Sequence, residues 1–391
     1  MRIIYYSHTC FADCDFPLIG ELQRRGHDVR YYISIASFSM RSTLIDIKKL
    51  YPKTGIFPAS QIYKEFLAYD KVLDLSQVYV VNQKHKQKFH PVNLLLMAKL
   101  VLHFIRQKPD VIHLTKPPYL TQKLIYWVKK KLVLTVHDPF PHSGKVTKQA
   151  ERNRKCAFKN ISRLVLLNDK QGDAFCEAYK IPPSHIFINK LGMYNSISLT
   201  PDALPVKDER KEGRPFILFF GIIAEYKGVE YLLEAMKIVH DSFPKVRLVV
   251  VGGGKYPIDI EQYKQSDYIE IRNRYIGAQE LAGLLKACEF GVCPYKDATQ
   301  SGVVQTAFSF NVPMIVTDVG ALGAAVEHGK TGLVVKPCNV DELAQAMCKL
   351  LSHKEILSQM RKAIEEEWKA TMEWGPIAEK YEEVYNASPV R

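Results

Sequence analysis

Short apolar runs alternate with longer amphipathic segments along the first half of the chain. The runs cover residues 3–6, 29–35, 111–114, 132–136 and 164–167, and segments of helical length such as 16–25 and 93–106 lie between them. Short apolar runs separated by helical segments are typical of parallel strands buried on both faces. The pattern therefore predicts a doubly wound α/β domain.

The same pattern begins again after a polar stretch at 202–214. Apolar runs follow at 216–223, 246–251, 269–271, 290–293, 314–316 and 333–335. Between the first two of them, an apolar stripe at helical spacing predicts a helix packed on the second sheet; its members are Val229, Leu232, Leu233, Met236 and Val239.

Three helical segments, 341–351, 354–369 and 376–386, close the chain. The last is rich in glutamate and is expected to return to the basic first domain. The predicted organisation is a first domain at 1–200, a second at 201–373 and a C-terminal helix at 374–391. With 391 residues, 47% of them hydrophobic, the chain has enough apolar material for two cores.

The eight cysteines are scattered and form neither a CxxC pair nor a zinc-ligand spacing. They indicate buried thiols in a reducing compartment. The N-terminal apolar run meets Ser7, His8 and Thr9 too early for a signal peptide, and the apolar stretch 92–105 is interrupted by Lys99 and His103. We therefore expect a cytoplasmic protein without a membrane-spanning segment or a metal site.

Positive charge is concentrated in the first half. Residues 1–200 hold 31 Lys and Arg against 14 Asp and Glu, whereas the remainder holds 23 against 27. The basic runs 84–88, 129–131 and 145–155 allow two interpretations, a solvated face or peripheral contact with the anionic inner face of a membrane. No basic motif interleaved with aromatic residues is present, so nucleic-acid binding is not expected.

Loops at the carboxyl ends of the second domain's strands are candidates for a donor site, because open α/β sheets bind ligands there. In the loop 221–228, Gly221 follows a strand and Lys227 stands at the positive end of a helix, where a cation is disfavoured unless an anion compensates. A bound nucleotide diphosphate would compensate the charge of Lys227. The alternative is that Lys227 is an ordinary solvated lysine in a loop.

Two further loops accompany it. The candidate donor-binding residues of the first loop are Thr299, Gln300, Ser301, Gly302, Val303 and Thr306. Backbone amides at the start of the helix that follows can hold phosphate oxygens. The alternative is that Ser301 is an ordinary N-cap. In the second, Gly252 and Gly253 would let the backbone approach a base or ribose, without the GxGxxG spacing of a dinucleotide site.

In the first domain, His137 follows a buried strand in a proline-limited loop. It is expected either to project toward a ligand or to bond a neighbouring carbonyl. The loop 7–15 carries His8, Asp13 and Asp15, which we interpret as the candidate acceptor site.

Taken in order, several blocks resemble the bacterial family 4 glycosyltransferases of the GT-B fold over essentially the whole chain. They are Gly26-His27-Asp28-Val29, Pro109-Asp110-Val111-Ile112-His113, Thr135-Val136-His137-Asp138, Tyr226-Lys227-Gly228 with Leu232-Leu233, the segment 312–320, Gly329-Lys330-Thr331-Gly332-Leu333-Val334 and Trp374 before Ile377 and Tyr381.

This resemblance implies two Rossmann-like domains facing a cleft, with the C-terminal helix crossing back to the first. It implies a nucleotide-sugar donor on the second domain, with Lys227 on the diphosphate, amides near Ser301 on phosphate and His137 at the transferred sugar. The implied reaction retains the anomeric configuration, uses no metal or resident cofactor, and glycosylates a carbohydrate or lipid-linked acceptor in cell-surface polysaccharide or lipopolysaccharide synthesis.

The sequence departs from the family pattern at the paired glutamates, whose positions hold Ala298 and Thr306, and at an arginine position that aligns with Ile222 or Ala224. The segment ATQSG resembles a variant branch of the family. Two alternatives stay open: a non-catalytic subunit that binds a sugar nucleotide or glycan beside an active transferase, and a sugar-nucleotide epimerase, which the missing carboxylates disfavour.

Overall fold

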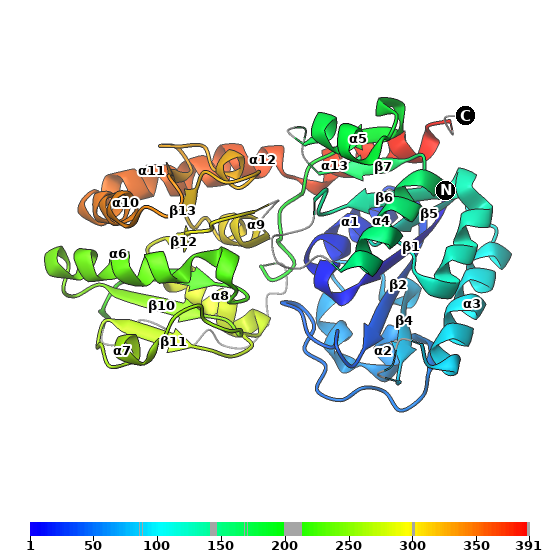
Figure 1. Cartoon of the computed structure of the whole chain (residues 1–391), viewed down its shortest axis with the longest axis horizontal. Helices are drawn as coiled ribbons and strands as arrows, with labels where there is room; N and C mark the ends of the chain where they lie inside the picture. The colour runs from blue at the N-terminus through cyan, green and yellow to red at the C-terminus, as the bar shows by residue number, and fades with distance from the viewer. Residues whose placement is uncertain are drawn as a thin grey trace. The chain divides into compact units, whose positions relative to one another are not determined.

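A computed structural model describes residues 1–85, 87, 89–140, 147–167, 169, 171–198, 213–298 and 302–388, with only the backbone of Lys130. These residues form two compact units (Figure 1). The first comprises the described residues of Met1–Pro141, Lys145–Pro201 and Glu373–Arg391, and the second those of Asp202–Met372. Among them, no helix is both long and apolar enough to cross a lipid bilayer.

The first unit is built on an eight-stranded sheet with the order β3-β4-β2-β1-β5-β6-β7-β8. All neighbours are parallel except β3 and β4, and β1 pairs with β2 from Arg2↔Asp28 to His8↔Ser34. The strands are β1 (Arg2–His8), β2 (Asp28–Ala36), β3 (Gly55–Pro58), β4 (Val78–Gln83), β5 (Val111–Leu114), β6 (Leu132–Val136), β7 (Leu164–Leu166) and β8 (Ile186–Ile188).

The five strands predicted in this half are confirmed, and β3, β4 and β8 were not predicted. The strands β3 and β8 lie at the two sheet edges, are three or four residues long and are only partly buried, so their sequences lack a strong apolar signal. The strand β4 is a buried run, Val78-Tyr79-Val80-Val81, next to the edge strand β3.

The helices of the first unit flank this sheet. They are α1 (Ala12–Arg24), α2 (Ala59–Ile62), α3 (Pro91–Arg106), α4 (Lys148–Asn160), α5 (Gly172–Tyr179) and α13 (Trp374–Asn386), with 3-10 segments η1 (Thr9–Phe11), η2 (Lys64–Tyr69), η3 (Leu75–Gln77), η4 (Leu120–Lys131) and η5 (Pro183–His185). The first helix begins at Ala12, not at Phe16, so the predicted loop 7–15 is wrong. Asp13 and Asp15 lie in its first turn, where carboxylates stabilise the positive helix end.

The C-terminal helix α13 packs on the first unit through both its backbone and its side chains. The indole Nε1 of Trp374 donates to the Met193 carbonyl (2.8 Å), and Glu382 accepts hydrogen bonds from Arg25 (2.8 Å). In the interior, the Tyr385 hydroxyl lies 2.7 Å from Nδ1 of His113. Burial lowers the pKa of His113 to about 3, so its imidazole is neutral in this network.

The second unit is a parallel sheet with the order β11-β10-β9-β12-β13-β14. Its strands are β9 (Phe216–Phe220), β10 (Arg247–Val251), β11 (Ile269–Arg272), β12 (Gly291–Cys293), β13 (Met314–Thr317) and β14 (Gly332–Val335). All six coincide with predicted runs. The order reverses between β9 and β12, and such a switch point is where open α/β sheets bind ligands.

Helices α6 (Val229–Ser242) and α10 (Val340–Ser352) pack against one another in this unit. The predicted stripe on α6, from Val229 to Val239, is buried, which confirms its role in the core. The remaining elements are α7 (Glu261–Lys264), α8 (Ala278–Ala287), α9 (Gly302–Ser309), α11 (Lys354–Ala363), the π-helical turn η9 (Ile364–Trp368), α12 (Lys369–Thr371), and the 3-10 turns η7 (Glu225–Lys227) and η8 (Gly323–Ala325).

Candidate functional sites

The loop after β9 is joined to the loop after β10 by backbone contacts that only glycine permits. Gly221 donates to the Val251 carbonyl (3.1 Å) and Ile223 to the Gly253 carbonyl (3.1 Å). A Cβ atom at Gly252 would lie 1.7 Å from the Gly221 carbonyl oxygen, and Gly252 has φ +144°. The missing side chain of Gly252 therefore serves the pairing of these two loops, and the contact of its backbone with a donor stays a prediction.

The same loop is fixed to the segment that follows β12. A Cβ atom at Gly228 would lie 2.0 Å from the Pro294 carbonyl oxygen, and the Lys296 amide donates to the Tyr226 carbonyl (2.8 Å). The Lys296 ammonium also pairs with Glu230 in the first turn of α6 (2.9 Å). These contacts place Lys227 just before α6, at the switch point of the sheet.

The Lys227 ammonium lies over the Tyr295 ring, 3.6 Å from its centroid. A tyrosine face attracts a cation by about 0.5–2 kcal/mol, which is comparable with the cost of placing a cation at a helix N-terminus. The unfavourable helix-dipole position is therefore offset within the protein. Tyr295 was not singled out from the sequence, although it follows a predicted strand by two residues.

The third predicted donor segment lies beside the first. A Cβ atom at Gly221 would lie 3.5 Å from Cγ2 of Val303, so α9 begins next to the loop after β9. The Thr306 hydroxyl is buried and donates to the Gly302 carbonyl within α9 (2.8 Å). Thr299, Gln300 and Ser301 lie outside the described residues. The structure thus brings Gly221, Lys227, Gly252, Gly253, Gly302 and Val303 to one end of the sheet.

A second candidate site is a pocket of about 870 Å³ in the first unit. It lies at the switch point of that sheet, because it is lined by residues that end or follow β1, β5 and β6. His8, Thr115 and His137 line it at these three positions. Its walls are mainly aromatic and apolar, with cationic side chains among them: Phe11, Phe38, Phe89, Tyr119, Phe158, Arg41, Lys116 and Arg154.

His137 stacks on Phe11 in this pocket, with ring centroids 4.0 Å apart and 15° between the ring planes. Its Nε2 atom is buried and has no hydrogen-bond partner in the described part of the chain. Burial lowers the pKa of His137 to about 4, with a smaller contribution from Lys116, so the imidazole is neutral near pH 7. A neutral imidazole nitrogen can accept or donate one hydrogen bond.

The three acceptor candidates are placed differently from one another. His8 lines the pocket, and burial lowers its pKa to about 3. Asp15 is fully buried and accepts hydrogen bonds from Tyr5 (2.9 Å) and Tyr31 (3.2 Å), while burial raises its pKa to about 7. Asp13 is also buried in α1, and neither carboxylate is among the lining residues. The sequence placed them on a loop because it did not reveal the early start of α1.

Comparison with known proteins finds a family match within the second unit. Residues 214–353 match the family model described as glycosyl transferases group 1. This region contains the loop after β9, Lys227 and the whole of α9. Residues 214–353 are therefore similar to this family.

Curated relatives are similar to parts of this chain. It is 24% identical over 224 residues to alpha-D-kanosaminyltransferase of Streptomyces kanamyceticus, covering 55% of this chain and 57% of that protein. It is 30% identical over 158 residues to D-rhamnosyltransferase WbpZ of Pseudomonas aeruginosa, covering 38% and 39% respectively. The chain thus spans about two fifths to three fifths of the length of these relatives.

Solved structures show the fold of the whole chain. Sucrose-phosphate synthase from Thermosynechococcus elongatus superposes with a TM-score of 0.67 at 16% identity, covering 98% of both chains. Anabaena Alr3699/HepE in complex with UDP gives a TM-score of 0.67 at 15% identity, covering 98% of this chain and 99% of that one. The predicted GT-B fold, with its two parallel-sheet α/β domains, is confirmed.

Proposed function

We propose that this protein is a glycosyltransferase that moves a sugar from a nucleoside-diphosphate sugar to a carbohydrate or lipid-linked acceptor. The pathway we propose is the synthesis of cell-surface polysaccharide or lipopolysaccharide. One observation carries the proposal: within the region that matches the group 1 family model, Lys227 and the start of α9 lie together at the sheet's switch point.

In this proposal, the donor diphosphate lies between the Lys227 ammonium and the amides of Gly302 and Val303. The loop that carries Lys227 is held before the donor arrives, because it is bonded to the Val251, Gly253 and Lys296 backbones. Fixed positive groups stabilise the negative charge that develops on a departing diphosphate, and they need no reorganisation during the reaction. The family 4 subtype, with its ATQSG variant, belongs to the same proposal.

The acceptor is proposed to occupy the pocket of the first unit, with His8 and His137 on its wall. We assign His137 an orienting role, since a neutral imidazole with a buried Nε2 can hydrogen-bond a sugar hydroxyl. Transfer is proposed to retain the anomeric configuration, by attack on the face from which the diphosphate leaves. It is further proposed to need no metal and to take place in the cytoplasm.

A thermal-shift panel of UDP-, GDP-, ADP- and dTDP-sugars tests the donor site. UDP-glucose is the first choice, because Alr3699/HepE is described in complex with it. A ligand at 100 times its dissociation constant stabilises the folded state by about 2.7 kcal/mol. We expect one donor class to stabilise the wild type and to lose this effect in Lys227→Ala. The matched control is Lys237→Ala, whose lysine pairs with Glu234 on the surface of α6.

Transfer itself is tested with the selected donor and candidate acceptors. Product formation that persists in EDTA, with the donor's anomeric configuration by NMR, would support the proposed chemistry. Donor binding without transfer or hydrolysis would instead favour the non-catalytic binding subunit. Absence of stabilisation by all four donor classes would contradict the donor site.

A further inference from the structure

The helix α3 carries large apolar side chains on both of its sides. Its inner side contributes Leu96, Met97, Leu100 and Phe104 to the core of the first unit. Its outer side exposes Val92, Leu95 and Leu102, and Phe89 is exposed just before its start. A surface helix ordinarily carries polar residues on its outer side, so this arrangement calls for an apolar environment outside the protein.

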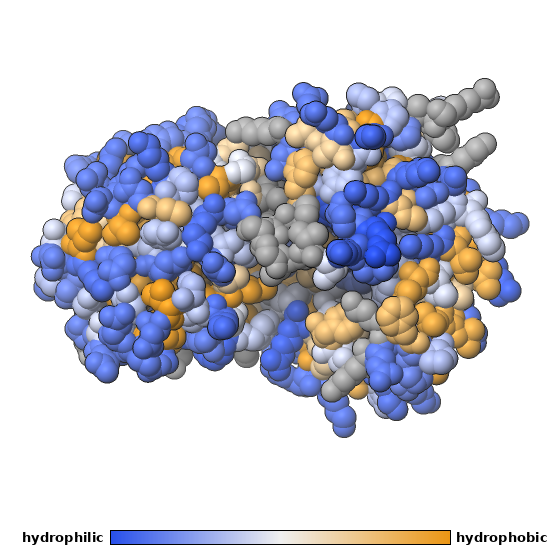
Figure 2. Space-filling model, viewed as in Figure 1, coloured by the Kyte–Doolittle hydropathy of each residue, from blue (hydrophilic) through white to orange (hydrophobic). Residues whose placement is uncertain are grey.

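These side chains form a continuous stripe. Val92, Leu95, Lys99, Leu102 and Arg106 follow one another at intervals of three and four residues, which places them on one helix face. Half of the ten large apolar side chains exposed in the described part of the chain lie between Phe89 and Trp127. Figure 2 shows apolar side chains gathered over α3.

The charge of this surface has one sign. Neither α3 nor η4, which packs beside it, contains a carboxylate, while the two segments carry Lys99, Arg106, Lys123 and Lys129 among their cations. Lysine and arginine can extend their ammonium and guanidinium groups outward while their aliphatic parts cover apolar surface. Leucines between lysines and arginines thus complement a layer that is anionic at its surface and apolar beneath.

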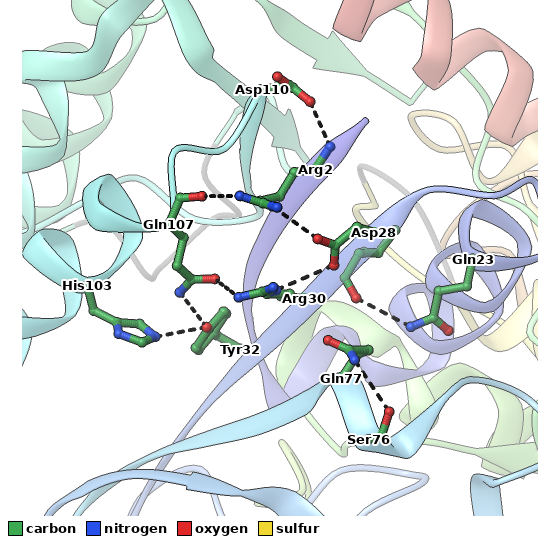
Figure 3. Close-up of polar contacts among 11 residues, drawn as sticks. Arg2, Gln23, Asp28, Arg30, Tyr32, Ser76, Gln77, His103, Gln107 and Asp110 are labelled. Carbon is green, nitrogen blue, oxygen red and sulfur yellow. Dashed lines mark hydrogen bonds and ion pairs between the residues drawn. The ribbon is translucent and has the colours of Figure 1, made fainter.

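The helix is held rigidly on the sheet. At its C-terminal end, the Gln107 carbonyl accepts from Arg2 (2.8 Å), and the Gln107 side chain bonds Arg30 (2.8 Å) and Tyr32 (2.7 Å) (Figure 3). On its flank, the Thr121 hydroxyl of η4 donates to the Leu94 carbonyl (3.0 Å). The outer leucines are therefore presented by a fixed helix and cannot turn into the core.

One residue links the exposed stripe to the acceptor pocket. Phe89 is 70% exposed and also lines the 870 Å³ pocket. A ligand held at the surface of a bilayer would reach the pocket past this ring.

We propose that the α3 face, defined as Phe89, Val92, Leu95, Lys99, Leu102 and Arg106 with Trp127 on the adjoining η4, docks on an anionic lipid bilayer. A second copy of the chain fits less well, because a self-complementary contact would bring Lys99 and Arg106 of both copies together. The proposal that the α3 face docks on a bilayer depends only on the fold. The proposal that this docking presents a lipid-linked acceptor to the pocket rests on the proposed function.

Vesicle cosedimentation tests the docking without donor or acceptor. We expect the wild type to bind vesicles that contain phosphatidylglycerol, to bind pure phosphatidylcholine vesicles weakly, and to lose binding as salt rises. Leu95→Ser with Leu102→Ser should weaken binding at least about tenfold, since both leucines lose most of their apolar surface. Lys99→Glu with Arg106→Glu should abolish the preference for anionic lipid.

The chain offers a matched control. Leu67 on η2 is 54% exposed and Leu95 is 55% exposed, so Leu67→Ser is the control for the single variant Leu95→Ser, with the same change of side chain outside the α3 face. We expect Leu67→Ser to bind vesicles as the wild type does. Unchanged circular dichroism and melting temperature would show that each variant folds.

Trp127 provides a second readout. It is 77% exposed, whereas Trp368 and Trp374 are buried, and these are the three tryptophans of the chain. A blue shift of tryptophan emission on vesicle binding, absent in Trp127→Phe, is expected because indole rings settle at the lipid interface.

Three outcomes would overturn the proposal. They are equal loss of binding in the Leu67 control, wild-type binding in the α3 double variants, and vesicle binding without a shift in emission. Concentration-dependent dimerisation that is lost in the α3 variants, with no vesicle binding, would identify a second copy as the partner. Donor stabilisation measured without vesicles separates all of these from failure of the proposed function.

Discussion

The ammonium group of Lys227 lies 3.6 Å from the centroid of the Tyr295 ring. Lys227 precedes α6 by two residues, and Tyr295 follows β12 by two, so the contact joins the loops on the two sides of the sheet's switch point. The ring helps to hold the ammonium group in place.

Replacement of Tyr295 should therefore weaken donor binding through Lys227. We expect Tyr295→Leu to raise the dissociation constant of the donor sugar nucleotide about 2- to 30-fold, equivalent to about 0.5–2 kcal/mol, and Tyr295→Phe to remain within about twofold. Isothermal titration calorimetry would measure both. Equal losses in the Leu and Phe variants would show that the ring face does not act on Lys227.

Gly252 is expected to tolerate no side chain. In Gly252→Ala, the new Cβ would meet the Gly221 carbonyl at 1.7 Å, and the residue would keep a φ of +144°. Steric conflict and backbone strain together should lower the free energy of unfolding by about 2–4 kcal/mol.

Gly277 offers the comparison for this change. A Cβ there meets nothing within 4 Å and its φ is −76°, so Gly277→Ala should change stability by less than about 1 kcal/mol. Chemical denaturation of both variants measures the difference. If Gly252→Ala proved as stable as Gly277→Ala, the tight pairing of the two loops would be disproved.

Phe11 should control the protonation of His137. Burial holds the pKa of His137 near 4, below its ordinary value of 6.5, and the stacked Phe11 ring covers one face of the imidazole. In Phe11→Leu, solvent should reach this face and raise the pKa toward 6.5, so that the imidazole becomes protonated as pH falls through about 6. Phe11→Tyr keeps the ring and serves as control.

The predicted consequence is a new inflection in the pH–rate profile of sugar transfer. Wild type and Phe11→Tyr should lack an inflection due to His137 between pH 5 and 7, whereas Phe11→Leu should lose activity as pH falls through this range. A profile with the same shape in all three proteins would show that Phe11 does not set the pKa of His137.

Glu382 should make the docking of α13 sensitive to acid. Hydrogen bonds from Arg25 lower the pKa of Glu382 to about 2, with a further contribution from His27, against an ordinary value of 4.5. A carboxyl whose pKa is lower in the folded state stabilises the protein fully above pH 4.5 and loses this contribution as pH falls toward 2. Because the pair is partly exposed, the effect should diminish in high salt.

Acid unfolding followed by circular dichroism would measure this dependence. Glu382→Gln should be less stable than the wild type at pH 7 and should lose less stability between pH 4.5 and 2. Glu383→Gln changes the adjacent, exposed glutamate of the same helix and should behave as the wild type does. Parallel curves for wild type and Glu382→Gln would contradict the role of this pair.

Much of the fold was determined by the sequence alone. The period of apolar positions predicted five of the six inner strands of the first sheet, all but β4, and all six strands of the second, because strands buried on both faces require apolar runs. The edge strands β3 and β8 lacked this signal. The candidate donor-site glycines and Lys227 could also be identified from the sequence, because they lie in loops that follow predicted strands.

The tertiary structure decided what those residues do. Whether Gly252 faces a ligand or a carbonyl depends on how closely the loops after β9 and β10 approach, and the sequence does not encode that distance locally. Asp15 was interpreted as part of an acceptor site on a loop, but the packing of α1 on the sheet buries it between two tyrosines. The Lys227–Tyr295 and Phe11–His137 contacts join residues far apart in the chain, and only the folding of parallel strands brings their loops together.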